Sequence, residues 1–117
     1  MGENILKDKS YFFAIEIVKA AEQIISQRKE YVLSKQLIRS GTAIGALIRE
    51  AEFAQSKPDF INKMSISLKE ANETLYWINL LKDTDYISEE LFITLSKDCR
   101  ELISILVASV KTAKATK

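Results

Sequence analysis

The 117-residue sequence contains no histidine. That absence excludes Ser-His and Cys-His nucleophile pairs, imidazole zinc sites and the Glu-x-x-His pairs of di-iron bundles. Cysteine occurs once, as Cys99, so no disulfide can form within the chain. A reducing cytoplasm is therefore the expected location, and we expect neither a metal nor another cofactor.

Turn-forming residues are scarce, with three glycines and one proline. A β-rich fold needs more of them, whereas long helices joined by short turns do not. No stretch approaches the roughly 18 uninterrupted apolar residues of a membrane-spanning helix. The first nine residues are polar and no apolar run follows them, so we expect no signal peptide. The length predicts one domain, residues 1–117.

Apolar residues recur at three- and four-residue spacing through four segments, which is the signature of helical faces. The pattern predicts helices at about 9–29, 35–55, 57–82 and 89–112. Short connections make successive helices antiparallel neighbours. The sequence therefore predicts an all-α, up-and-down antiparallel four-helix bundle, with a loose start at residues 1–7 and a frayed C-terminal tail.

Polar residues mark the expected helix starts. Ser34, Ser56 and Ser88 each precede an apolar-periodic segment, as N-caps do, and Asp8 or Ser10 can cap the first helix. Pro58 falls in the first turn of the third helix, where its missing N–H does no harm.

The first helix carries two apolar stripes. One, expected to face the core, comprises Tyr11, Ile15, Val18, Ala21 and Ile25; the other comprises Phe13, Ile17, Ala20 and Ile24. The third and fourth helices also carry extra stripes, and monomers rarely expose large contiguous apolar patches. We therefore expect self-association through a surface that includes Phe13, Ile17, Ile66, Trp77, Leu80, Ile103 and Val107. The alternative is a core wide enough to take several of them.

Gly41 and Gly45 lie one turn apart inside the second helix. Each costs about 1 kcal/mol relative to alanine there, so a neighbouring backbone is expected to come close. The neighbour is either another helix of the bundle or another subunit.

The sequence shows no recognisable arrangement of catalytic residues. The pairs Glu70 and Glu73, or Glu50 and Glu52, lie near lysines or arginines on amphipathic helices, where solvated charge is the usual interpretation. Cys99 lies on the core stripe of the fourth helix, which favours an inert buried thiol over a nucleophile. We predict no catalytic residue and no enzymatic activity.

Charge is unevenly distributed although the formal net charge is only +1. Residues 28–49 are basic and residues 50–101 acidic, which is not the balance of a dedicated nucleic-acid binder. A local patch could still contact phosphates, as long cationic side chains do. Its candidate residues are Arg39, Arg49, Lys57 and Lys63. The alternative is a solvated helix face balanced by Glu50, Glu52 and Asp59.

The stretch QLIRSGTAIGALIREAEFAQSKPDFINKMSISLKEANETLYWINLL closely resembles the bacterial four helix bundle protein family, also called the 23S rRNA intervening-sequence protein family. The matching elements are Arg39-Ser40, Ile44-Gly45-Ala46, Glu50, Ser56 to Phe60, and Leu68 to Glu73. Leu47 departs from the family, which often has asparagine there.

The resemblance implies a four-helix bundle that assembles as a cyclic homopentamer and has no enzymatic activity. Some members are encoded within 23S rRNA genes, and a related basic bundle serves diversity-generating retroelements by binding nucleic acid and the reverse transcriptase. The expected partners are thus other copies of the chain, with RNA, DNA or another protein as further candidates and no membrane. Arg39 is the basic position that the family motif carries over.

Overall fold

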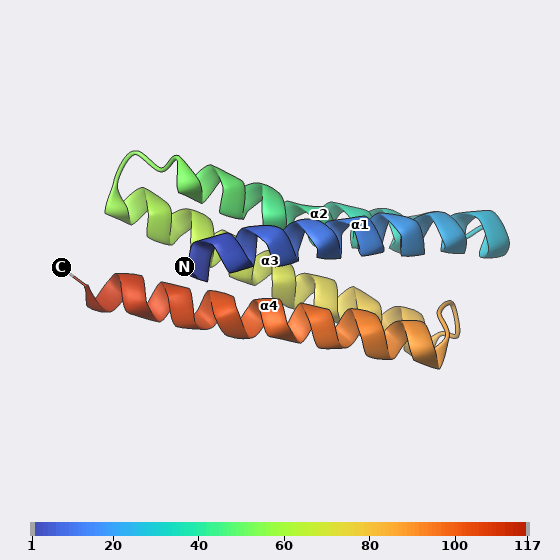
Figure 1. Ribbon diagram of the computed structural model, residues 1–117. Coiled ribbons are helices and arrows are strands. Elements are labelled where there is room, and N and C mark those ends of the chain that lie inside the picture. The colour runs from blue at the N-terminus through green and yellow to red at the C-terminus, as the bar shows by residue number, and fades with distance from the viewer. Residues whose placement is uncertain (1, 117) are drawn as a thin grey trace.

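Four long helices form the structure, a computed structural model that describes residues 2–116. They are α1 (Gly2–Arg28), α2 (Val32–Glu52), α3 (Lys57–Asp83) and α4 (Glu89–Ala115). Figure 1 shows them running up and down along one long axis. The bundle measures 50 × 21 × 19 Å. The predicted antiparallel four-helix bundle is confirmed.

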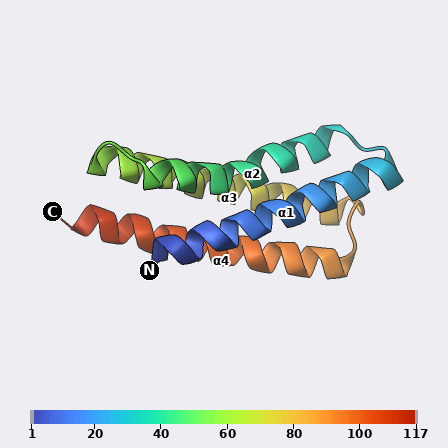
Figure 2. The same ribbon diagram turned by 45° about the horizontal axis from the view of Figure 1, so that its top comes forward.

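The helices pack in the order of the chain, and α1 closes the bundle against α4. The α2–α3 pair is the closest and the α1–α4 pair is the loosest. Figure 2 shows the consequence: α2 and α3 lie together on one side of the bundle, while α1 and α4 lie on the opposite side. The described helices include none with the length and hydropathy of a membrane span.

The helices extend further at both ends of the chain than the sequence indicated. α1 already begins at Gly2, and Leu6 is fully buried in the core. The expectation of a loose segment at residues 1–7 is therefore wrong for its described part, since an apolar anchor draws the first turns onto the bundle. α4 continues to Ala115, so most of the expected tail is helical; Met1 and Lys117 lie outside the described residues.

The start of α2 differs from the prediction that Ser34 is its N-cap. The Glu30 carboxylate accepts hydrogen bonds from the backbone N–H groups of Val32, Leu33 and Ser34, at 3.1, 3.0 and 2.9 Å. Burial raises the pKa of Glu30, but these hydrogen bonds outweigh it, and the pKa lies below its ordinary value. Ser34 is itself buried, and its Oγ donates to the Glu30 carbonyl at 2.9 Å. Glu30 thus supplies the cap that Ser34 was expected to provide.

The other two predicted serine caps are confirmed. Ser56 Oγ accepts from the Asp59 backbone N–H at 3.2 Å, and Ser88 Oγ accepts from that of Leu91 at 3.1 Å. Pro58 lies in the first turn of α3, as predicted.

The core uses the other stripe of α1. The buried side chains of this helix include Phe13, Ile17 and Ile24, whereas Tyr11 is 58% exposed and Val18 is 38% exposed. The expected assignment of the two stripes was therefore wrong, except at Ala21 of the first stripe, which is fully buried as expected. The reason lies on α2, because the bare backbone at Gly41 leaves room for Ile17: a Cβ at position 41 would stand 2.8 Å from Ile17 Cγ2.

Gly45 makes a similar approach to α1. A Cβ there would lie 3.2 Å from Ser10 Oγ and 3.4 Å from the Ser10 backbone oxygen. Both glycines therefore serve packing between α1 and α2 within the bundle, which decides between the two alternatives that the sequence left open.

Buried polar groups tie neighbouring helices together. Ser67 Oγ on α3 donates to the Ile44 carbonyl on α2 at 2.9 Å, and the hydroxyls of Thr74 and Ser40 lie 3.0 Å apart. Cys99 Sγ on α4 donates to the Ala71 carbonyl on α3 at 3.3 Å. Within the described residues, every buried side-chain nitrogen and oxygen has a hydrogen-bond partner. These bonds fix the register of α3, and with it the position of the surface residues described next.

Candidate functional site

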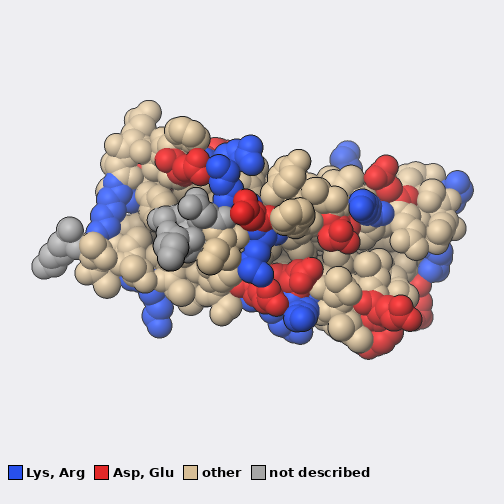
Figure 3. Space-filling model, viewed as in Figure 1, with Lys and Arg blue, Asp and Glu red and all other residues tan. Residues whose placement is uncertain are grey.

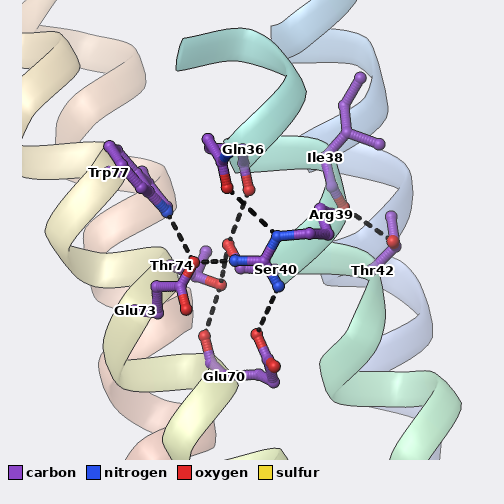
Figure 4. Close-up of polar contacts among 9 residues, drawn as sticks. All are labelled: Gln36, Ile38, Arg39, Ser40, Thr42, Glu70, Glu73, Thr74 and Trp77. Carbon is purple, nitrogen blue, oxygen red and sulfur yellow. Dashed lines mark hydrogen bonds and ion pairs between the residues drawn. The ribbon is translucent and has the colours of Figure 1, made fainter. Parts of the chain in front are cut away.

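A polar cluster bridges α2 and α3 at mid-bundle (Figure 4). Arg39 of α2 reaches across to α3, where Nη1 donates to Glu70 Oε1 at 3.3 Å and Nη2 pairs with the Glu73 carboxylate. Its Nε donates to Gln36 Oε1 at 3.2 Å on its own helix. All three guanidinium nitrogens are therefore engaged, and the side chain is held in one orientation.

Trp77 joins the same cluster. Its indole Nε1 donates to Glu73 Oε2 at 3.0 Å, so a single carboxylate links Trp77 to Arg39. The neighbouring Tyr76 ring meets the indole edge to face, with centroids 5.0 Å apart and planes at 75°. Trp77 is half-buried, which leaves part of a large apolar surface in contact with water.

Trp77 belongs to a stripe along the side of α3 that faces α2. Ile66, Glu70, Glu73, Trp77 and Leu80 follow one another at spacings of four, three, four and three residues, and all five are half-buried. That spacing is the one used by helices that pack against a partner helix. We call this stripe together with Arg39 the α2/α3 face.

The chemistry of the α2/α3 face is that of a fixed ion pair beside apolar side chains. The Glu70 side chain is 19% exposed and that of Arg39 is 49% exposed. Because Glu70 and Glu73 flank a guanidinium, they do not form the isolated carboxylate pair that acid–base catalysis would use. Among the described residues, no three Cys, Asp or Glu side chains lie together in a way that could hold a metal ion. The arrangement suits recognition of another surface.

The four predicted basic residues do not gather in one patch. Arg39 is paired with two glutamates, and Lys63 Nζ lies 3.5 Å from Glu50 Oε1. Arg49 follows Arg39 by ten residues on the same helix, about 15 Å along its axis, and Lys57 is exposed at the start of α3. Figure 3 shows acidic and basic side chains interspersed over the face that it views.

The predicted interface residues fall into three groups. Phe13 and Ile17 are 2% and 0% exposed, so they are core residues, and their expected place on the outer surface is wrong. Ile66, Trp77 and Leu80 lie together on the α2/α3 face. Ile103 is half-buried and Val107 is 40% exposed on α4, the helix that packs against α3 and α1.

A groove between α1 and α4 was missed at the sequence level. It forms a cavity of about 230 Å³ whose lining includes Phe12, Glu16, Asp98 and Glu101. Burial and the Glu101 carboxylate raise the pKa of Asp98 above its ordinary value. The sequence contained one indication of this groove, because Phe12 is a large apolar residue of the first helix that lies outside both of its apolar stripes.

Fold and surface together define a class: a four-helix bundle whose α2/α3 face combines paired charges with half-buried apolar side chains. The sequence profile described as 23S rRNA-intervening sequence protein matches residues 3–108. The chain belongs to this family.

A solved structure agrees with that assignment. It is a crystal structure of a protein of unknown function from the S23 ribosomal protein family of Bacteroides thetaiotaomicron, 50% identical in sequence, with a TM-score of 0.93. The match covers 95% of the present chain and 99% of that one. No curated protein matches the chain.

Proposed function

We propose that the protein is a non-enzymatic subunit of a homo-oligomer that acts as a scaffold or adaptor. The observation that carries the proposal is the state of Trp77: its large indole is held in place by Glu73 and is only half-buried, although its stripe lies on the side of α3 that faces α2. Aromatic anchors that are rigid and partly exposed dominate the energetics of protein–protein interfaces. Five copies is the subunit number that the family resemblance implies.

Further apolar side chains support self-association. Phe12 and Ile5 on α1 and Ile93 on α4 are each more than half exposed, in addition to the residues of the α2/α3 face. The proposal places the assembly in a reducing cytoplasm, which the single buried thiol of Cys99 supports.

The sole tryptophan makes the proposal measurable without any substitution. If Trp77 becomes covered by a second copy, its fluorescence should shift to longer wavelength as the protein is diluted and the oligomer dissociates. The shift should coincide with the fall in molecular mass observed by light scattering over the same concentrations. Dissociation without a shift would remove Trp77 from the interface, whereas a mass of 13.3 kDa at every concentration would contradict the proposed function.

Nucleic-acid binding by the assembled protein is a second candidate function. It is favoured by the basic side chains at one end of the bundle. Arg49 in the last turn of α2 and Lys114 in the last turn of α4 lie at this end, together with Lys57 at the start of α3. Repetition of such an end in every subunit would add up weak phosphate contacts.

The second candidate predicts sequence-independent affinity that weakens with salt. A double substitution, Arg49→Ala with Lys57→Ala, should weaken binding of a labelled RNA in fluorescence anisotropy. Arg39→Ala is the matched control, because the Arg39 charge is already balanced by Glu70 and Glu73. Equal affinities for all forms would remove this end of the bundle as a nucleic-acid site.

A further inference from the structure

One side of α4 is exposed along most of the helix. Among the described helices, α4 packs against α3 and α1, and Figure 1 shows it along one edge of the bundle. Six exposed residues follow one another on its outer side at spacings of four, three, four, three and four: Ile93, Lys97, Arg100, Ser104, Val107 and Lys111. We call these six residues the outer stripe of α4. At a rise of 1.5 Å per residue, the stripe is about 27 Å long.

The shape of the outer stripe suits a helical partner. Alternating steps of three and four residues keep side chains on one line of a helix surface, and a second helix packs along such a line. Ile93 and Val107 are 55% and 40% exposed, so they offer apolar area to a partner. Ser104 lies between them, and its small side chain lets another helix come close. An open cavity of about 540 Å³ follows the first half of the stripe, and its lining includes Phe92, Ile93 and Ser104.

The outer stripe carries positive charge only. Its ionisable residues are Lys97, Arg100 and Lys111. None of the ion pairs formed among the described side chains involves these three cations. The sequence that follows Glu101, to the last residue, contains no aspartate or glutamate.

The carboxylates of α4 have other neighbours. Glu101 borders the same cavity but pairs with Lys9 of α1 at 3.1 Å, and Asp98 lines the groove between α1 and α4. Glu89 and Glu90 lie in the first turn of α4, where acidic residues complement the positive end of the helix dipole. Positive charge therefore predominates along the outer stripe from its second residue onward.

We infer that the outer stripe of α4 is a docking surface for an acidic amphipathic helix of another protein. Carboxylates on that helix pair with the three cations, and its aliphatic side chains cover Ile93 and Val107. The two aliphatic residues favour a protein partner over a nucleic acid, because a phosphate backbone would leave them without apolar contacts. The inference goes beyond the proposed homo-oligomer, since it assigns a different partner to a surface separate from the α2/α3 face.

A designed peptide tests this docking surface. The probe is a fluorescein-labelled helical peptide of alanine and glutamine, into which Glu, Leu, Ala, Glu, Glu and Leu are placed in that order. Their spacings of four, three, four, three and four match the outer stripe read in the antiparallel direction. Fluorescence anisotropy should show saturable binding to the unmodified protein that weakens with salt. The control peptide, with glutamine at the three glutamate positions, should bind roughly tenfold more weakly, because three charge pairs are lost.

Protein variants locate the binding site of the peptide. Lys97→Glu combined with Arg100→Glu should reduce affinity for the acidic peptide by roughly tenfold or more, and should leave the mass measured by light scattering unchanged. Lys19→Glu combined with Lys35→Glu is the matched control, since it changes the net charge equally at exposed lysines of α1 and α2. This control should bind like the unmodified protein. Ile93→Ser should weaken binding of both peptides, because it removes an apolar contact.

Several results would overturn the inference. One is the absence of saturable binding, and another is equal affinity of the peptide for the unmodified protein and for the variant changed at Lys97 and Arg100. Dissociation of that variant to a 13.3 kDa monomer would make the stripe a contact between copies. Tighter binding of a single-stranded RNA to the stripe would make it a nucleic-acid site. A monomeric unmodified protein that still binds the peptide at the stripe would contradict the proposed homo-oligomer and support the inference.

Discussion

Ile17 of α1 packs directly onto the backbone of Gly41 in α2, so closely that an added Cβ at position 41 would lie 2.8 Å from Ile17 Cγ2 and 2.9 Å from Cγ1. Ile17 is fully buried and surrounded by other core side chains. Close-packed interiors have no room for an extra methyl group. The α1–α2 contact therefore depends on glycine at this position.

Gly41→Ala should destabilise the protein. Overpacking typically costs about 1–3 kcal/mol, and the better helix propensity of alanine offsets about 1 kcal/mol of that. Urea unfolding followed by circular dichroism measures the difference. Gly45→Ala is the control, because its Cβ would lie 3.2 Å from the Ser10 hydroxyl and so requires a smaller adjustment. A Gly41→Ala protein as stable as the original would contradict the packing account.

Glu30→Gln should lower stability at neutral pH, by about 1 kcal/mol, as the loss of other N-terminal caps does. The folded-state pKa of Glu30 lies below its ordinary value of 4.5. Its ionised form therefore contributes stability above that value, and the contribution is lost as the pH falls through the folded-state pKa.

Denaturant titrations of both proteins at pH 7 and at pH 3 measure this effect. The difference between the original protein and the Glu30→Gln variant should be present at pH 7 and reduced at pH 3. A difference that is the same at both pH values would show that the charge of Glu30 does not cap α2.

The bundle itself could be predicted from the sequence, but the details depend on contacts between helices. Ser56 and Ser88 are recognisable caps because each bonds within its own helix start. Ser34 misleads because α2 begins two residues earlier, at Val32, where the Glu30 carboxylate accepts from the first N–H groups of the helix, including that of Ser34 itself. Periodicity could not choose between the two apolar stripes of α1, because that choice is made by space on another helix, at Gly41.

The candidate site was predictable only in part, for the same reason. Arg39 and Trp77 stood out as individual residues. Both residues contact Glu73, and these contacts depend on the register of α3 against α2. That register is set by the turn between the two helices and by buried hydrogen bonds such as the one from Ser67 to Ile44.

Cys99 should resist thiol reagents in the folded protein. Burial raises its pKa to about 12, so almost none is present as the reactive thiolate at pH 8. A chromogenic disulfide reagent should therefore react slowly until denaturant is added, and then reach one thiol per chain. Rapid stoichiometric reaction without denaturant would mean that α4 opens readily from the core.

Arg39 and Glu73 should show only modest energetic coupling in the single chain. Both side chains are at least one-third exposed, and exposed ion pairs contribute about 0.2–1 kcal/mol. A double-mutant cycle of Arg39→Ala and Glu73→Gln, measured by urea unfolding under dissociating conditions, gives the coupling free energy. A coupling of several kcal/mol would mean that the pair serves the folding of the bundle, and would contradict its proposed role at the surface that binds another copy.

Light scattering on a size-exclusion column, with the unmodified protein in moderate salt, tests whether this bundle associates with copies of itself. We predict a mass that is a multiple of the 13.3 kDa monomer, with five copies as the expected number. A single peak at 13.3 kDa across the accessible concentration range would contradict it.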